Sequence, residues 1–201
     1  MSLSLVTGPT QEPVTIEEAK QHMRIEVSAD DAMVAAFVLA AREWVEGQIK
    51  RSLITQTFDY FIDWDWPTVG YTDRIMLPIN PVQSVTSISY IDDNGATQTL
   101  AASQYTVVAR ESGSYVEPAY NVDWPSVRCV PNAIVVRFTA GYIDTTTSPQ
   151  VNKVPFPLRT AVLMMAAHMY ENREATTVRN INEAPLAVET LISPYRDARF
   201  Q

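Results

Sequence analysis

The chain has 201 residues, of which 46% are hydrophobic, and its formal net charge is −8. This apolar content excludes disorder over the whole chain and suits one sizeable core or two small ones. The acidic balance, with only three lysines, argues against a duplex-binding protein, because neutralising DNA phosphates requires clustered Lys and Arg. The single Cys129 excludes an internal disulfide framework and a cysteine-rich zinc site.

The first quarter of the chain predicts two helices. Thr15-Ile16-Glu17-Glu18 has the form of a capping box and opens a short helix that ends near residue 24. A second helix start at residues 28–31 leads into a longer helix that extends to about residue 51. Within it, the apolar residues recur at helical spacing and predict a broad buried face. The stripe consists of Met33, Phe37, Ala40 and Trp44, widened by Val34, Val38, Ala41 and Val45.

The other side of this long helix carries charge. Arg42 and Glu46 stand four residues apart, a spacing that predicts a surface ion pair worth a few tenths of a kcal/mol. Gly47 is unfavourable inside a helix by about 1 kcal/mol relative to Ala, which predicts either a close neighbour or a bend there.

The hydrophobic period then changes from 3.6 to 2. From residue 57 to residue 66, aromatic and aliphatic side chains alternate with polar ones, which predicts a strand with one buried face. Asp59, Asp63 and Asp65 lie on its polar side, and we interpret them as the solvated face of a strand rather than as catalytic carboxylates.

Four further strands are expected, over residues 85–91, 96–100, 105–110 and 133–140. The first two flank Asn94-Gly95, a strong hairpin signal, because both central residues of a type I′ turn need positive φ. These strands should therefore pair antiparallel.

The helical pattern resumes with "VPFPLRTAVLMMAAHMYENREAT" at residues 154–176, which predicts a helix from about Pro155 to Glu174. Its uncharged part is eleven residues, or about 16 Å, against a hydrocarbon core of about 30 Å, so it cannot span a bilayer. The N-terminus lacks the basic start and apolar run of a secretory signal, so no export is expected. A last short helix is expected over residues 185–193, before Pro194.

The order of helices, strands and helices predicts an α+β fold, in which the N- and C-terminal segments form a helical bundle core and an antiparallel β domain is inserted. We place the N-terminal arm and first helices at residues 1–54, the β region at 55–151, and the C-terminal helices with an interaction tail at 152–201.

The sequence carries no pattern that indicates an enzyme, a metal or a cofactor. His168 and Glu171 could share a helix face, but His22 is the only other imidazole and a zinc site needs about four protein ligands. We interpret His168 as a hydrogen-bonded core or interface residue. An EF-hand is excluded at Asp92-Asp93-Asn94-Gly95 by Tyr90 and Ala101, which stand where acidic ligands would be required.

Several segments, taken together and in order, resemble the head-tail connector (adaptor) proteins of tailed bacteriophages and gene-transfer particles. They cover most of the chain: "PVTIEEAKQHMRI", "DDAMVAAFVLAAREWVEGQIKRSLITQT", "LPINPVQSVTSISYIDDNG", "VPNAIVVRFTAGY", "VPFPLRTAVLMMAAHMYENRE" and "PLAVETLISPYR". The resemblance implies a non-enzymatic virion protein of the neck, assembled in the host cytoplasm as a ring of about a dozen copies below the portal. Such a ring would extend the DNA channel, let double-stranded DNA pass without specific binding, and receive a neck or tail-completion protein. No membrane is implied.

Three sets of candidate contact residues follow from this resemblance. A ring needs two different side patches on each copy, and the subunit-interface candidates are Met164, Met165, His168 and Met169. Family adaptors grip the portal protein with their C-terminal part, and aromatic and arginine side chains are enriched at binding hot spots; the portal-contact candidates are Tyr195, Arg196, Arg199 and Phe200. The channel-facing candidates, which would repel DNA weakly, are Asp59, Asp63 and Asp65.

Two alternative functions stay open at this point. A stopper or tail-terminator neck protein belongs to the same machinery, but such proteins tend to be mainly β. A small hydrolase or ligand-binding domain is the alternative from another class, because sites are assembled in space rather than in sequence.

Overall fold

A computed structural model describes residues 1–63, 66, 73–144, 151–172 and 185–197. The chain divides into two compact units, each made of two separate stretches. The β unit contains Met1–Pro9 and Thr55–Gly141, and the helical unit contains Thr10–Ile54 and Tyr142–Gln201. Because helices and antiparallel strands occupy different units, the fold class is α+β, as predicted.

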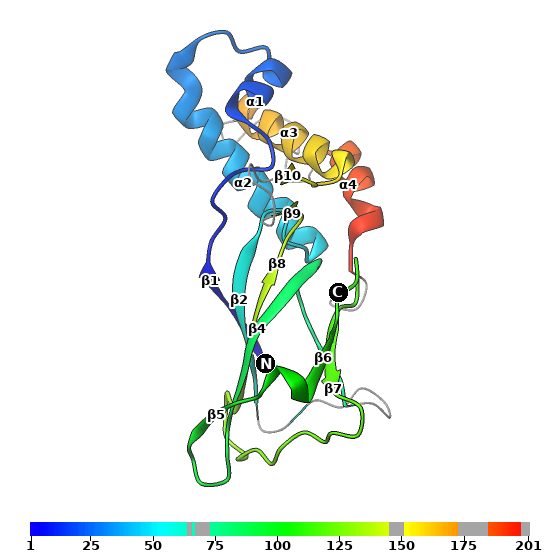
Figure 1. The fold of residues 1–201 in the computed structure, drawn as a ribbon. Coiled ribbons are helices and arrows are strands. Elements are labelled where there is room, and N and C mark those ends of the chain that lie inside the picture. Colours follow the sequence, from blue (N-terminus) through cyan, green and yellow to red (C-terminus); the bar gives the residue numbers. More distant parts are fainter. Residues whose placement is uncertain (64–65, 67–72, 145–150, 173–184, 198–201) are drawn as a thin grey trace. The chain divides into compact units, whose positions relative to one another are not determined.

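All four predicted helices are present in the helical unit (Figure 1). The elements of this unit are α1 (Ile16–Met23), η1 (Ser28–Asp30), α2 (Asp31–Ile49), β9 (Ile143–Asp144), β10 (Val151–Asn152), α3 (Phe156–Glu171), α4 (Leu186–Ile192) and η3 (Ser193–Tyr195). The capping box of α1 is confirmed, because the Thr15 hydroxyl accepts from the Glu18 amide while the Glu18 carboxylate accepts from the Thr15 amide. The predicted helix end at Glu174 lies outside the described residues.

The core of the helical unit lies where α2, α3 and α4 meet. From α2 it takes Val34, Val38, Ala41, Val45 and Ile49, from α3 Leu158, Ala161, Val162, Met165 and Ala166, and from α4 Val188 and Ile192. The broad buried face predicted for α2 is confirmed, but its centre is the row of Val34, Val38, Ala41 and Val45. Phe37 and Trp44 lie half-buried at its edge. Among the helices that the structure describes, none is both long and apolar enough to cross a membrane.

Arg42 differs most from its predicted setting, because it is buried on the core side of α2 and only 3% exposed. Its Nε donates to Glu12 at 2.8 Å, and its Nη1 donates to Glu46 at 2.7 Å. Glu46 also accepts from the Leu53 amide at 2.7 Å. The predicted surface pair is thus a buried network, because the chain before α1 folds back over this side of α2 and brings Glu12 with it. At Gly47, an added Cβ would meet no atom of the described residues within 4 Å, so the first of the two expected alternatives, a close neighbour, is not found among them.

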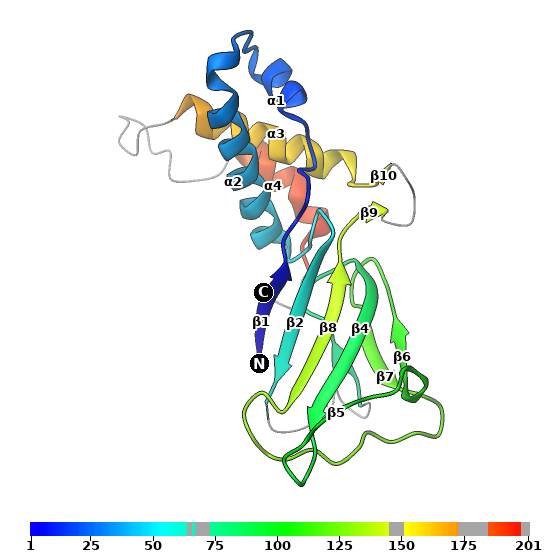
Figure 2. The ribbon, with the colours of Figure 1, turned by 60° about the vertical axis from the view of Figure 1, so that its left-hand side comes forward.

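The β unit contains two antiparallel sheets. Its elements are β1 (Ser2–Thr7), β2 (Gln56–Ile62), β3 (Ile75–Met76), β4 (Val82–Ile91), β5 (Thr97–Thr99), η2 (Ala102–Gln104), β6 (Tyr105–Val108), β7 (Tyr115–Pro118) and β8 (Ile134–Ala140). The larger sheet has the order β1-β2-β8-β4-β5 and the smaller one the order β3-β7-β6. Figure 2 shows β1, β2, β8 and β4 side by side.

The predicted alternation in β2 is confirmed, because Phe58 and Ile62 are buried and Phe58 stacks on Phe138 of β8 at 5.7 Å. The predicted pairing of β4 with β5 is also confirmed. The predicted turn type is wrong: Gly95 has φ +86°, whereas Asn94 does not have positive φ. Two amides, those of Asn94 and Ala96, instead donate to the Asp92 side chain, which closes a longer turn that needs only one left-handed residue.

The domain assignment at the N-terminus also differs from the expectation. We placed residues 1–54 together, but the first nine belong to the β unit because β1 pairs antiparallel with β2. Residues 142–151 belong in turn to the helical unit. The smaller sheet was foreseen only at β6. Strand β3 has two residues, and β7, although it is as long as β6, ends in Pro118, which indicates a break in the sequence pattern.

We expect the network around Arg42 to contribute strongly to stability. Replacing Arg42 with Met should lower the free energy of unfolding by about 3 kcal/mol, because it leaves carboxylates without their buried cation. Arg137 is the matched control, since its side chain is 45% exposed and it pairs with one carboxylate, that of Asp59. Arg137→Met should cost at most about 1 kcal/mol. Urea denaturation followed by circular dichroism measures both, and equal losses would contradict a special role for Arg42.

Candidate interaction surfaces

The C-terminal segment after α4 is fastened to the helical unit by Arg51, which is 5% exposed. The Arg51 Nε donates to the Tyr195 carbonyl at 2.7 Å, and the guanidinium lies 5.9 Å from the centre of the Tyr195 ring. Asp197 is 3% exposed, and its amide donates to the Ile49 carbonyl at 3.3 Å. Arg196 forms an ion pair with Glu189 of α4.

Two of the predicted portal contacts are therefore engaged within the monomer. Tyr195 and Arg196 are half-buried and hold the chain against the helices. The other two candidates, Arg199 and Phe200, lie outside the described residues. Sequence reasoning assigned the segment after Pro194 to an interaction tail, and it missed the contact with Arg51 because a cation 144 residues away leaves no local signal.

The subunit-interface candidates of α3 fall into two groups. Met165 is 8% exposed and belongs to the core, so it is not available at a surface. Met164, His168 and Met169 are half-buried, and both methionines pack against the edge of the core. The His168 carbonyl accepts from the backbone and side-chain amides of Asn172, which closes the end of α3. Across the part of the chain that the structure describes, no cluster of His, Cys, Asp or Glu could hold a metal ion.

The aspartates of the five-stranded sheet are paired rather than free. Asp59 of β2 faces Arg137 of β8 and accepts two hydrogen bonds from its guanidinium at 2.7 Å. Asp63 accepts from the Met1 ammonium and from the Asn132 amide, both at 2.8 Å. The bond from the ammonium is the main cause that lowers the pKa of Asp63. Asp65 lies outside the described residues. Two of the three channel-facing candidates thus carry their negative charge beside a positive one.

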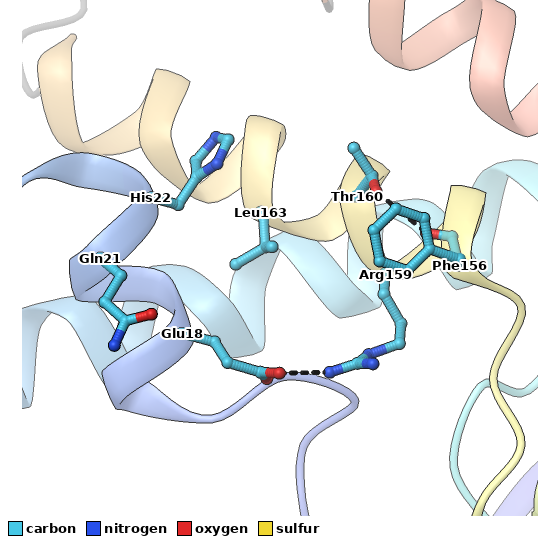
Figure 3. Close-up of a pocket in the computed structure, with 7 residues that line it drawn as sticks. All are labelled: Glu18, Gln21, His22, Phe156, Arg159, Thr160 and Leu163. Carbon is cyan, nitrogen blue, oxygen red and sulfur yellow. Dashed lines mark hydrogen bonds and ion pairs between the residues drawn. The ribbon is translucent and has the colours of Figure 1, made fainter.

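A shallow groove of about 370 Å³ lies between α1 and the start of α3 (Figure 3). It is lined by Glu18, Gln21, His22, Phe156, Arg159, Thr160 and Leu163. Arg159 joins the two walls through an ion pair with Glu18, and Phe156 is 75% exposed at the rim. Only the capping role of Glu18 was predicted from sequence; its pairing with Arg159 depends on how α1 packs on α3.

The fold and these surfaces define a small α+β protein in which Glu18, Asp59, Asp63 and Glu189 form ion pairs within the chain. Comparison with known proteins gives the family: the model of the phage gp6-like head-tail connector proteins matches residues 13–117 and 133–196. The chain belongs to this family. It is a structural connector of the virion neck, where head and tail join.

Solved structures give the same result over nearly the whole chain. A chain in the virion of a native gene transfer agent particle is 26% identical with a TM-score of 0.77, and the match covers 99% of this chain and 97% of that one. Chains in the neck of an empty particle, computed with C6 symmetry, and in the neck of a native particle, computed with C12 symmetry, are each 25% identical with TM-scores of 0.74 and the same coverage. No curated protein sequence matches the chain.

The Glu18 contacts predict an acid-sensitive contribution to stability. The Thr15 amide, opposed by burial and aided by Arg159, lowers the pKa of Glu18 below its usual 4.5. A carboxylate whose pKa is lower in the folded state than in the unfolded state stabilises the fold at pH values above its unfolded-state pKa. This stabilisation is lost as the pH falls through its folded-state pKa. The stability difference between the wild type and Glu18→Gln should therefore be largest at neutral pH and shrink below about pH 4.5. Urea denaturation from pH 7 to pH 3 measures it, and a constant difference would contradict the assignment.

Because Arg51 holds the C-terminal segment, two C-terminal deletions should differ in their thermal unfolding midpoints. Removing residues 198–201 should leave the unfolding midpoint unchanged. Removing 194–201 should lower it clearly, because Arg51 loses a buried carbonyl partner and a ring contact. Thermal denaturation of both deletion variants measures this. Equal midpoints would show that Tyr195 and Asp197 do not hold the segment in place.

Proposed function

We propose that the protein assembles in the virion neck as a ring of about twelve copies, which joins the head to the tail and continues the DNA channel. The observation that carries this proposal is the match over 99% of this chain and 97% of a chain in a neck computed with C12 symmetry. A sixfold axis is contained in a twelvefold one, so the neck computed with C6 symmetry supports the same arrangement. In such a ring, copies meet through two different patches.

Within each copy, we propose that α1 to α4 form the helical core bundle and that the protein acts without catalysis. The family is structural, and the acidic groups described above already have internal partners. Glu18 caps α1 and pairs with Arg159, while Asp59 pairs with Arg137. The lowered pKa of Glu18 makes its carboxylate a poor general base, and both carboxylate oxygens of Asp59 already accept from Arg137.

The proposed contacts start from the candidates named in the sequence, together with their exposure where the structure describes it. We propose that the half-buried Met164, His168 and Met169 contribute to contacts with a neighbouring copy, since flexible methionines adapt to varied partners. Residues after Asp197 are assigned to the portal protein, and a neck or tail-completion protein would bind the other side of the ring. These assemblies would form in the host cytoplasm.

For the channel, we propose that DNA passes without specific binding. The net charge of −8 disfavours phosphate contacts. If Asp59 and Asp63 face the channel, each presents a paired charge, so repulsion of DNA at these positions is weak.

The test is the mass of the purified chain by light scattering, alone and mixed with portal rings. Twelve copies of the 22.5 kDa chain have a mass of about 270 kDa, which we expect as the increase in mass over the portal ring alone. The 198–201 deletion should form the same fold but bind portal rings more weakly. A protein that stays monomeric and ignores portal rings would overturn the proposal, whereas wild-type portal binding by the deletion variant would overturn only the portal surface.

A further inference from the structure

The smaller sheet directs one face to the core of the β unit and the other face away from it. Val116 of β7 is 0% exposed in this core, and Val107 of β6 stands opposite it. Because side chains alternate between the two faces of a strand, Tyr115 lies on the outer face. Its exposed fraction is nevertheless only 7%. Two arginine side chains lie over its ring.

These two arginines place two positive charges close together. The Cζ atoms of Arg74 and Arg110 lie 4.4 Å and 5.3 Å from the centre of the Tyr115 ring, so they are within about 10 Å of each other. A guanidinium held over an aromatic ring keeps its N–H donors at its edge, where they can bind a carboxylate. The pair is therefore arranged for an anionic partner before that partner binds.

Arg110 is the member of this pair that lacks a carboxylate partner. The Nε of Arg74 donates to Glu117 at 2.9 Å. Arg110 is exposed, and neither Glu111, the next residue, nor any other carboxylate of the described residues forms an ion pair with it. An anionic partner would therefore bind mainly to Arg110, with Arg74 adding positive charge beside it. We call Arg74, Arg110 and Tyr115 together the arginine site.

The turn between β4 and β5 presents negative charge on another part of the β unit. Asp93 is exposed at this turn, and within the described residues its carboxylate forms no hydrogen bond or ion pair. The Asp92 side chain accepts from amides of the turn, which fixes the backbone beside Asp93. Arg128 lies against Gly95 of the same turn but forms no ion pair with either aspartate. Figures 1 and 2 show this turn at the lower end of the β unit, apart from β6 and β7.

Opposite charges matter for assembly because each copy is acidic. The β unit has nine acidic and four basic side chains, so the β units of two copies repel each other unless opposite charges meet. DNA phosphates would meet the same excess of carboxylates, which favours a protein partner over DNA. A ring also needs two different patches on each copy, and the arginine site and the turn at Asp93 are such a pair.

We propose that the turn at Asp93 of one copy binds the arginine site of a second copy of this chain, and that an ion pair between Asp93 and Arg110 joins neighbouring β units. This inference rests on the proposed function, because it names a contact between neighbouring copies of the ring. It explains why an acidic unit places two of its four basic side chains over one tyrosine ring.

A charge swap tests this contact in the full-length chain. Arg110→Glu and Asp93→Arg each place like charges at every contact, so each should raise the chain concentration for half-maximal assembly on portal rings by about fivefold or more. The double variant Arg110→Glu, Asp93→Arg restores opposite charges and should return to within about twofold of the wild type. The matched control combines Arg110→Glu with Asp123→Arg, because Asp123 is exposed in the same unit and the net charge changes equally. This control should stay as weak as Arg110→Glu alone.

Light scattering of mixtures with portal rings measures the assembled mass, and circular dichroism checks that each variant folds. If Arg110→Glu does not fold, Asp93→Arg decides alone, since Asp93 has no partner within the described residues. Rescue by the charge swap, without rescue by the control, is the result that supports the inference.

Wild-type assembly by either folded single variant, or a double variant as weak as the single ones, would overturn the inference. It would also be overturned if Arg110→Glu assembles normally but binds duplex DNA less well than the wild type, because the arginines would then face DNA. In each of these cases a wild-type increase of about 270 kDa over the portal ring would leave the ring itself intact. A wild-type chain without this increase would contradict the proposed function as well.

Discussion

The helical unit depends on the buried guanidinium of Arg51. This one group donates to the Tyr195 carbonyl near the C-terminus and to the Tyr142 hydroxyl, where the chain returns from the β unit. It follows directly on α2, so it joins three points that are far apart in sequence. A charge that is 5% exposed is stable only with such partners, because its desolvation is costly. The hydrogen bonds of this one cation therefore hold together the two separate chain segments that make up the helical unit.

Arg42, which lies within α2 and nine residues before Arg51, has a similar role. It draws in Glu12 from the segment before α1 and Glu46 from its own helix, and burial opposes its charge while these carboxylates raise its pKa. The two arginines fix the segments that enter and leave the helices, whereas the apolar contacts of α2 with α3 and α4 supply the core. Segments that are held by buried ion pairs and hydrogen bonds open locally less often than segments without them.

The β unit has ion-paired aspartates beside its larger sheet but few charges along the edges of that sheet. Its internal acidic groups are paired, and its turn at Asp92 is held by several amides. Its two sheet edges, by contrast, carry neither charges nor prolines at β1 and at the first half of β4. The register of β1 with β2 shifts between Leu5 and Thr7, and that of β4 with β8 shifts twice within residues 82–87. Such irregularities are one way in which a protein protects the edge of a sheet.

The sequence by itself determined the type and order of most elements. Capping chemistry at Thr15, the helical period of α2 and α3, and the alternation in β2 are local, and local patterns reflect which face each element buries. The head-tail connector family was also recognisable from ordered segments. The sequence did not determine the pairing of β1, because a six-residue strand of Ser, Leu, Val and Thr has the same pattern whether its neighbour is near or far. Nor did it determine the burial of Arg42 and Arg51 or the role of Tyr195, since these depend on partners up to 144 residues away, and only the tertiary structure brings such groups within hydrogen-bonding distance.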